Sequence, residues 1–188
     1  EICACLVGSE MCIRDRIEKG RSELEYIDSV LDTVSRAESE RELAQIREEL
    51  TEQGYLRKQK GKQRPQAALP PLEFTSSDGF KILVGRNNTQ NDKLTLKIAN
   101  KNDMWLHTKD IHGSHTVVFA EGREISDTAI LEAAQLAAYY SKARESSQVP
   151  VDYTLVRYVS KPSGARPGMV IYVNNKTVYV TPKANISE

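Results

Sequence analysis

Apolar residues near the start of the chain recur at the spacing of a coiled coil. Leu24, Ile27, Leu31 and Val34 are separated by three, four and three residues, which is the spacing of a and d positions. Polar residues take the next two positions of this series, so the repeat ends after two heptads. Because helices this short are marginal by themselves, the pattern predicts the stump of a longer helical hairpin that belongs to a larger protein.

A second helix is predicted directly after this repeat. Ser39 and Glu42 have the spacing of a capping box, and Gly54 is a typical residue to end a helix. Residues 17–54 are therefore predicted to form a helical coiled-coil remnant and a short helix; the alternative is a simple helical pair that caps the following domain. The apolar face of the second helix is formed by Leu43, Ile46 and Leu50.

The first 16 residues share no pattern with the rest of the chain. They begin with an acidic residue and place four charged residues after a short apolar patch, an order unlike that of a secretory signal. We therefore expect residues 1–16 to be a non-native leader. This segment also holds all three cysteines. The remaining chain thus offers neither a disulfide framework nor a paired-cysteine metal site, which favours a cytoplasmic location.

Residues 55–73 have the composition of a linker. Three prolines oppose regular structure there, and five basic residues stand against one acidic residue. A solvated tether is one interpretation of this segment. The other is a polycation that reaches the phosphate backbone of a nucleic acid.

From residue 74 to residue 188 the pattern changes to short strands and two helices. The order β-α-β-β-α-β-β-β predicts an α+β domain with a mixed, mainly antiparallel sheet and two packed helices. Ser126 or Asp127 is expected to cap the second helix, and Asn174-Asn175 to form a tight turn. Strands are expected at 80–84, 104–108, 116–119, 152–159, 169–173 and 177–180, and helices at 87–99 and 127–144.

The charge of the chain is balanced overall but unevenly distributed. The 26 basic and 26 acidic residues give a net charge of zero, which argues against a uniformly basic nucleic-acid binder. Residues 17–54 carry −6, whereas residues 74–188 carry +3. No apolar run approaches the length of a membrane span. A protein of 188 residues with this composition is expected to be one soluble domain with additional segments.

Three histidines lie within nine residues and raise the question of a metal site. His107 and His115 would face each other across a hairpin, but apart from Asp110 no acid or cysteine nearby completes a ligand set. Ser114 and His115 are adjacent on a strand and point to opposite faces, which disfavours a nucleophile–base pair. We therefore expect no metal, no cofactor, no small-molecule substrate and no enzymatic activity.

A run of cations without acids is the strongest indication of chemistry. Between Tyr153 and Ser187 there are five basic residues and no acidic one, with tyrosines interleaved. Cations beside aromatic rings suit phosphate contacts and base stacking in RNA. A second candidate is Arg86 with the amides that follow it, at a strand-to-helix junction where free N–H groups favour an anion. The alternative for Arg86 is an internal pair with Asp92 or Asp103.

Several blocks of sequence, in order, resemble one known family. They are VGRNNTQND at 84–92, DMWLH at 103–107, GSH at 113–115, the Ala133-Ala134 to Tyr140-Ser141 stretch, and KPSGA at 161–165 with Pro167-Gly168. This series strongly resembles the C-terminal NFACT-R domain of the NFACT family, from about residue 74 to residue 182. Residues 43–55 also resemble the segment that precedes this domain. His112 departs from the family, which usually has proline there.

The resemblance implies a factor of ribosome-associated quality control. Its partners would be tRNA and the large ribosomal subunit, and its effect would be C-terminal alanine tailing of stalled nascent chains, which this part of a family member is not expected to perform by itself. Some family members are called fibronectin-binding proteins, so the alternative is an adhesin domain at the bacterial cell surface, reached by non-classical export. The candidate RNA-binding residues are Arg86, Asn87, Asn88, Asn91, Trp105, His107, His115, Lys161 and Arg166.

Overall fold

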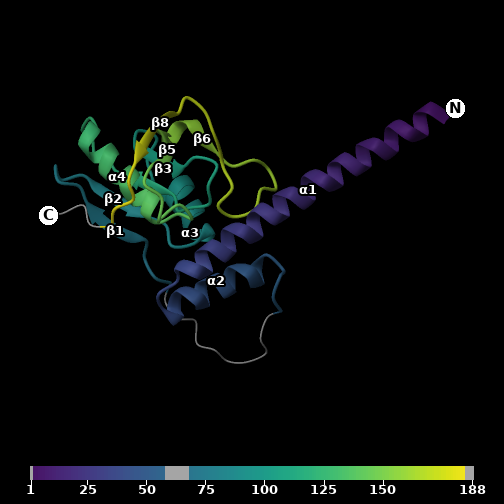
Figure 1. Ribbon diagram of the computed structural model, residues 1–188, viewed down its shortest axis with the longest axis horizontal. Coiled ribbons are helices and arrows are strands. Elements are labelled where there is room, and N and C mark those ends of the chain that lie inside the picture. The colour runs from purple at the N-terminus through teal and green to yellow at the C-terminus, as the bar shows by residue number, and fades with distance from the viewer. Residues whose placement is uncertain (1, 58–67, 185–188) are drawn as a thin grey trace.

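The computed structural model describes residues 2–57 and 68–184, with only the backbone for residues 2–11. It consists of a helical hairpin and an α+β domain (Figure 1). The hairpin is formed by α1 (Ile2–Arg36) and α2 (Glu40–Glu52). Figure 1 shows the N-terminal part of α1 projecting far beyond the domain.

The domain is built on a six-stranded sheet with the strand order β1-β2-β4-β3-β5-β8. All of the pairings between these strands are antiparallel. A separate two-stranded ribbon is formed by β6 (Val159–Ser160) and β7 (Ile171–Tyr172). The strands of the main sheet are β1 (Leu72–Thr75), β2 (Lys81–Val84), β3 (Met104–Thr108), β4 (Thr116–Val118), β5 (Val149–Leu155) and β8 (Lys176–Val180).

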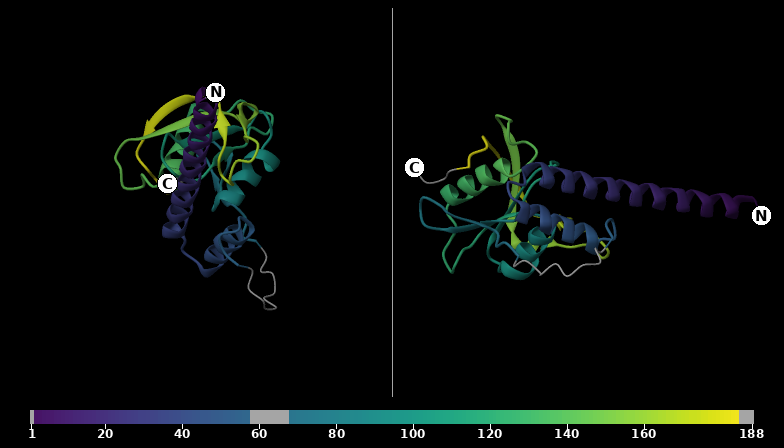
Figure 2. Two further views of the ribbon diagram at one scale, coloured as in Figure 1. Left: turned by 90° about the vertical axis from the view of Figure 1, so that its right-hand side faces the viewer. Right: turned by 90° about the horizontal axis from the view of Figure 1, so that it is seen from below.

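Each face of the sheet carries its own hydrophobic core. One face packs against α4 (Asp127–Tyr139), whose inner surface is formed mainly by alanines that permit close approach to the strands. The opposite face packs around Trp105 and is covered by the π-helix η1 (Leu94–Ile98) and the ribbon β6–β7, with the 3-10 helix η2 (Val156–Tyr158) beside it. Figure 2 shows α4 on one side of the sheet and α1 extending from the other. The predicted α+β class and mainly antiparallel sheet are confirmed.

The hairpin uses a different seam from the predicted one. Tyr26 and Val30 of α1 are buried against Ile46 of α2. The predicted a and d residues Leu24 and Leu31 remain exposed in the described structure. The capping box of Ser39 and Glu42 forms as predicted, and Gly54 adopts the positive φ of a residue that ends a helix. The view of this hairpin as the stump of a longer coiled coil stays a prediction.

Several details differ from the predicted elements. The strand predicted at 152–159 divides into β5, η2 and the first residue of β6. Strand β1 starts at Leu72, inside the segment predicted as a linker, most of which lies outside the described residues. The helix predicted at 87–99 divides into α3 (Asn88–Lys93) and η1, which buries Thr95 so that its hydroxyl meets His115. Helix α4 ends at Tyr139 instead of continuing to Arg144, because Ser141 leaves the helix to bridge Gly113. Helix α1 runs without a break through the predicted boundary at residue 16.

Candidate nucleic-acid interface

The predicted amide cluster after β2 folds into the first turn of α3. Asn87 caps this helix, since its Oδ1 accepts a hydrogen bond of 2.9 Å from the backbone N–H of Gln90. Asn91 turns inward, where its Oδ1 accepts the backbone N–H of His115 at 3.1 Å. Gly85 passes so close to Asn91 that a β-carbon at position 85 would overlap the amide. These asparagines are buried, so their amides hold the local backbone.

A polar row on α2 contacts this same turn. Glu42, Gln45 and Glu49 are spaced by three and four residues and therefore share one face of the helix. Gln45 accepts hydrogen bonds of 3.4 Å from the side-chain amides of Asn87 and Gln90. Glu49 accepts the backbone N–H and the hydroxyl of Thr89, at 2.9 and 3.1 Å. The amide of Asn88 donates to Ser29 of α1 at 2.9 Å.

Arg86 belongs to this contact between hairpin and domain. Its guanidinium forms an ion pair with Glu42 and donates to the carbonyl of Pro70 at 2.9 Å. The acids considered from the sequence have other partners, because Asp92 pairs with Lys161 and Asp103 accepts backbone N–H groups. The structure thus favours a stabilising role for Arg86 with a partner that the sequence did not indicate, and the RNA contact stays a prediction.

Replacing Arg86 with alanine should therefore lower stability. The lost pair is only about one-fifth exposed, 22% for the arginine and 15% for the glutamate. Charge-assisted hydrogen bonds of this kind contribute roughly 1–2 kcal/mol here, which corresponds to a decrease in melting temperature of about 3–6 °C. Thermal unfolding of R86A, E42A and the double variant measures the coupling between the two residues. Full loss of RNA affinity at an unchanged melting temperature would instead identify Arg86 as an RNA ligand.

Lys161 and Arg166 are also engaged within the protein. Lys161 forms an ion pair with Asp92, whose other oxygen accepts the backbone N–H of Gly168 at 3.0 Å. The guanidinium of Arg166 donates to Gln53 at 3.3 Å and lies 5.3 Å from the ring centroid of Tyr55. Lys161 and Arg166 therefore connect the loop between β6 and β7 to other elements of the protein. Figure 1 shows this loop reaching α1.

The three aromatic candidates form one cluster beneath the ribbon. Trp105 is fully buried, with its ring 4.8 Å from Tyr172, 5.2 Å from His115 and 5.8 Å from His107 between centroids. The rings of His107 and His115 lie 5.5 Å apart, so the prediction that they face each other is confirmed. Burial lowers the pKa of His107 to about 4 and that of His115 to about 3. Both imidazoles are therefore neutral at pH 7. His115 lies in the core, whereas His107 is only partly buried.

The structure gives the positions of the residues that the sequence raised as candidates for catalysis or metal binding. Among the described residues, no group of three or more potential metal ligands is present. Ser114 is buried and accepts a hydrogen bond of 3.3 Å from Arg36, while the imidazole of His115 bonds to Thr95 at 2.8 Å. Ser114 and His115 thus have separate partners, and both directly precede β4 instead of lying on a strand as expected. None of the helices that the structure describes is long and apolar enough to cross a bilayer.

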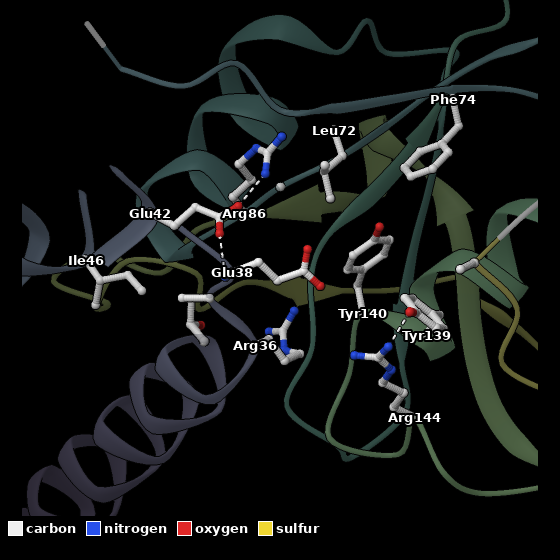
Figure 3. Close-up of a pocket in the computed structure, with 14 residues that line it drawn as sticks. Arg36, Glu38, Glu42, Ile46, Leu72, Phe74, Arg86, Tyr139, Tyr140 and Arg144 are labelled. Carbon is white, nitrogen blue, oxygen red and sulfur yellow. Dashed lines mark hydrogen bonds and ion pairs between the residues drawn. The ribbon is translucent and has the colours of Figure 1, made fainter. Parts of the chain in front are cut away.

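A cleft of about 260 Å³ lies between the hairpin and the domain (Figure 3). Its wall includes three guanidinium groups, but each has a partner within the protein. Arg36 pairs with Asp32, Arg86 pairs with Glu42, and Arg144 contacts the hydroxyl of Tyr139. Two acidic residues, Glu38 and Glu42, lie on the same wall, so most of the positive charge in this cleft is offset.

Other cations on the domain remain exposed, and the sequence-based site list did not include them. Lys93, Lys97 and Lys101 follow one another at intervals of four along and just after α3 and η1, and Arg157 lies beside them in η2. The signal was present in the sequence, because residues 93–102 contain three lysines and no acid. The longer acid-free run that begins at residue 153 was the stronger indication of an RNA-binding site.

Comparisons with known proteins identify the domain. The family model for the NFACT protein RNA-binding domain matches residues 71–174, and the model for the NFACT N-terminal and middle domains matches residues 8–68. The protein named Rqc2 homolog RqcH from Bacillus subtilis (strain 168) is 48% identical over 181 residues, which cover 95% of this chain and 31% of that protein. The RqcH homologue from Streptococcus suis (strain 05ZYH33) is 45% identical over 167 residues, 88% of this chain and 30% of that protein.

A solved structure shares the same fold. It is the C-terminal part of the fibronectin/fibrinogen-binding protein from Streptococcus suis, with a TM-score of 0.88 and 41% identity, covering 94% of this chain and 70% of that chain. The chain spans about one-third of the length of the curated relatives that it matches. These matches agree with the resemblance found in the sequence blocks. The chain belongs to the NFACT family and contains the RNA-binding domain of that family.

Proposed function

We propose that this chain is the RNA-binding module of a ribosome-associated quality-control factor, which acts in the cytoplasm. The match of residues 71–174 to the NFACT RNA-binding domain carries this proposal. The relatives named Rqc2 homolog RqcH support the connection to quality control. In this proposal the module binds tRNA and the large ribosomal subunit and supports C-terminal alanine tailing as part of a longer protein. It acts by binding and performs no reaction of its own.

The charge distribution of the domain supports a polyanionic partner. Residues 153–184 contain no acid, and Arg157, Lys176 and Lys183 are exposed there. Lys161 is the one cation of this segment for which the described structure contains an ion pair. Exposed cations that have no carboxylate partner are free to replace the counterions of a nucleic acid.

Binding of tRNA should therefore depend steeply on salt. If about three to five phosphates are contacted, a plot of log affinity against log salt should have a slope of roughly −3 to −4. Fluorescence anisotropy of labelled tRNA at several salt concentrations measures this slope. A flat response would contradict the electrostatic basis of the proposal, and no binding at low salt would contradict the function itself.

The named activity of the structural neighbour supports a second candidate. That protein is described as fibronectin/fibrinogen-binding, and its structure covers nearly the whole of this chain. The alternative is therefore an adhesin domain that binds fibronectin at the cell surface. Capture of fibronectin by the immobilised chain, compared with capture of tRNA at the same salt concentration, distinguishes the two candidates.

A further inference from the structure

Exposed cations and apolar side chains lie on the neighbouring segments η1 and η2, and we call this set of residues the η1–η2 face. Both segments cover the core around Trp105, because Leu94, Val156 and Val159 meet in it. Arg157 donates to the carbonyl of Lys101 through its backbone N–H and its Nε, each at 3.3 Å. These bonds fix the end of η1 next to η2. The η1–η2 face consists of Leu96, Lys97, Ile98, Lys101, Arg157 and Tyr158.

The acids that flank these segments in the sequence are held inside the protein. Asp92 pairs with Lys161. Asp103 is buried and accepts the backbone N–H groups of Asn100 and Ala120, at 2.7 and 2.9 Å. Asp152 is also buried and accepts the hydroxyls of Tyr172 and Thr177. These acids therefore do not neutralise the three cations of the η1–η2 face.

Apolar side chains of the same two segments are also exposed. The exposed fractions are 38% for Tyr158, 41% for Leu96 and 48% for Ile98. The five residues of η1 form a π-helix, a geometry that often occurs at functional sites. A partner that contacts both the cations and the exposed apolar side chains needs negatively charged groups. It also needs accessible flat rings. Single-stranded RNA has both properties, because its phosphates carry charge and its unpaired bases stack on aromatic side chains.

We propose that the η1–η2 face binds a single-stranded or looped segment of RNA, with Tyr158 stacking on a base and Lys97 and Lys101 contacting phosphates. This inference rests on the proposed RNA-binding function and adds the surface and the form of RNA that it takes. It assigns the contact to residues other than Arg86, Lys161 and Arg166, whose charged groups are engaged within the protein.

The test measures binding of the whole chain to a short oligouridylate, to double-stranded RNA of equal length and to tRNA. The oligouridylate should bind more tightly than the duplex, because its bases are accessible. Tyr158→Ala should weaken oligouridylate binding about 5- to 150-fold with little change in salt slope, the range measured for loss of one stacked base. Lys97→Gln and Lys101→Gln should each reduce the salt slope by about 1.

Two matched controls are available in the chain. Tyr179 is an exposed tyrosine on β8, and Lys142 is an exposed lysine after α4. Tyr179→Ala and Lys142→Gln should leave affinity and slope nearly unchanged. The lysine variants should melt at the wild-type temperature, because their side chains are exposed. Tyr158 is 38% exposed, so binding by Tyr158→Ala is compared at a temperature where this variant is fully folded.

The outcomes separate this inference from the proposed function. If the wild-type chain binds none of the RNAs at low salt, both are wrong. If it binds tRNA with the expected salt slope but the Tyr158, Lys97 and Lys101 variants behave like the controls, only the η1–η2 face is wrong. Preference for the duplex over the oligouridylate would also overturn the inference.

Discussion

Replacement of Glu49 by alanine should lower the free energy of unfolding by about 2–4 kcal/mol. Glu49 is only 3% exposed and accepts hydrogen bonds from the hydroxyl of Tyr26 at 3.0 Å and from Thr89. Burial, together with the adjacent Glu49 carboxylate, raises the pKa of Tyr26. Hydrogen bonds to charged groups contribute roughly 1.5–3 kcal/mol each, and their loss leaves buried donors without a partner. The hairpin should then separate from the domain more easily.

The neighbouring residue provides the control for this prediction. Glu48 lies on the same helix, carries the same charge and is exposed. Glu48→Ala should change stability by no more than about 0.5 kcal/mol, as is usual for surface positions. Urea unfolding of both variants measures the difference. Equal and small effects of the two substitutions would contradict the view that Glu49 fastens the hairpin to α3.

Acidification from pH 7 to pH 5 should cost about 2 kcal/mol of stability for each of His107 and His115. Their pKa values are about 4 and 3 in the folded protein, against 6.5 for an ordinary histidine. The unfolded chain therefore binds protons that the folded chain does not, and stability decreases as the pH falls below 6.5. The slope is about 1.4 kcal/mol per pH unit for each histidine. The loss should continue to about pH 4 for His107 and about pH 3 for His115, where the folded protein begins to bind the same protons.

Carboxylates affect stability in a lower pH window. The hydrogen bonds and charge that act on Glu42 and Asp78 lower their pKa below the ordinary values of 4.5 and 3.8, so these groups lose stabilisation only as the pH falls through that range. Denaturant unfolding at several pH values between 7 and 5, for the wild-type chain and for His107→Gln and His115→Gln, isolates the histidines. Each variant should have a smaller pH slope. An unchanged slope would mean that the histidines are already charged in the folded state.

Local signals in the sequence predicted much of the fold correctly. The capping box of Ser39 and Glu42, the cap of α4 at Ser126 and the positive φ of Asn174 depend on adjacent residues, and all three are present. Strand β1 was missed because its four residues directly follow prolines and lie at an edge of the sheet, where burial is incomplete. The seam of α1 was misplaced because Tyr26, which packs against α2, also carries a polar hydroxyl.

The residues predicted to bind RNA at 86–88 instead contact the hairpin, and their partners lie in distant segments of the sequence. Arg86, Asn87 and Asn88 resemble anion ligands when they are considered alone, since a guanidinium and amides precede a helix. Their partners Glu42, Gln45 and Ser29 lie more than 40 residues earlier, and no local pattern indicates that α2 packs on this turn. The burial of Asp103 and Asp152 was not predictable from the sequence either. Because these acids are buried, the nearby cations lack them as carboxylate partners.

We propose that the protein holds RNA on the η1–η2 face, whereas Arg86, Asn87 and Asn88 hold the hairpin against the domain. Photo-crosslinking of 4-thiouridine-labelled tRNA to the wild-type chain, followed by mass spectrometric identification of the crosslinked residues, distinguishes these two roles. Crosslinks are expected on the η1–η2 face, in the segments around Lys97 to Lys101 and at Tyr158. Crosslinks concentrated instead at residues 86–91, Lys161 and Arg166, with none on the η1–η2 face, would contradict it.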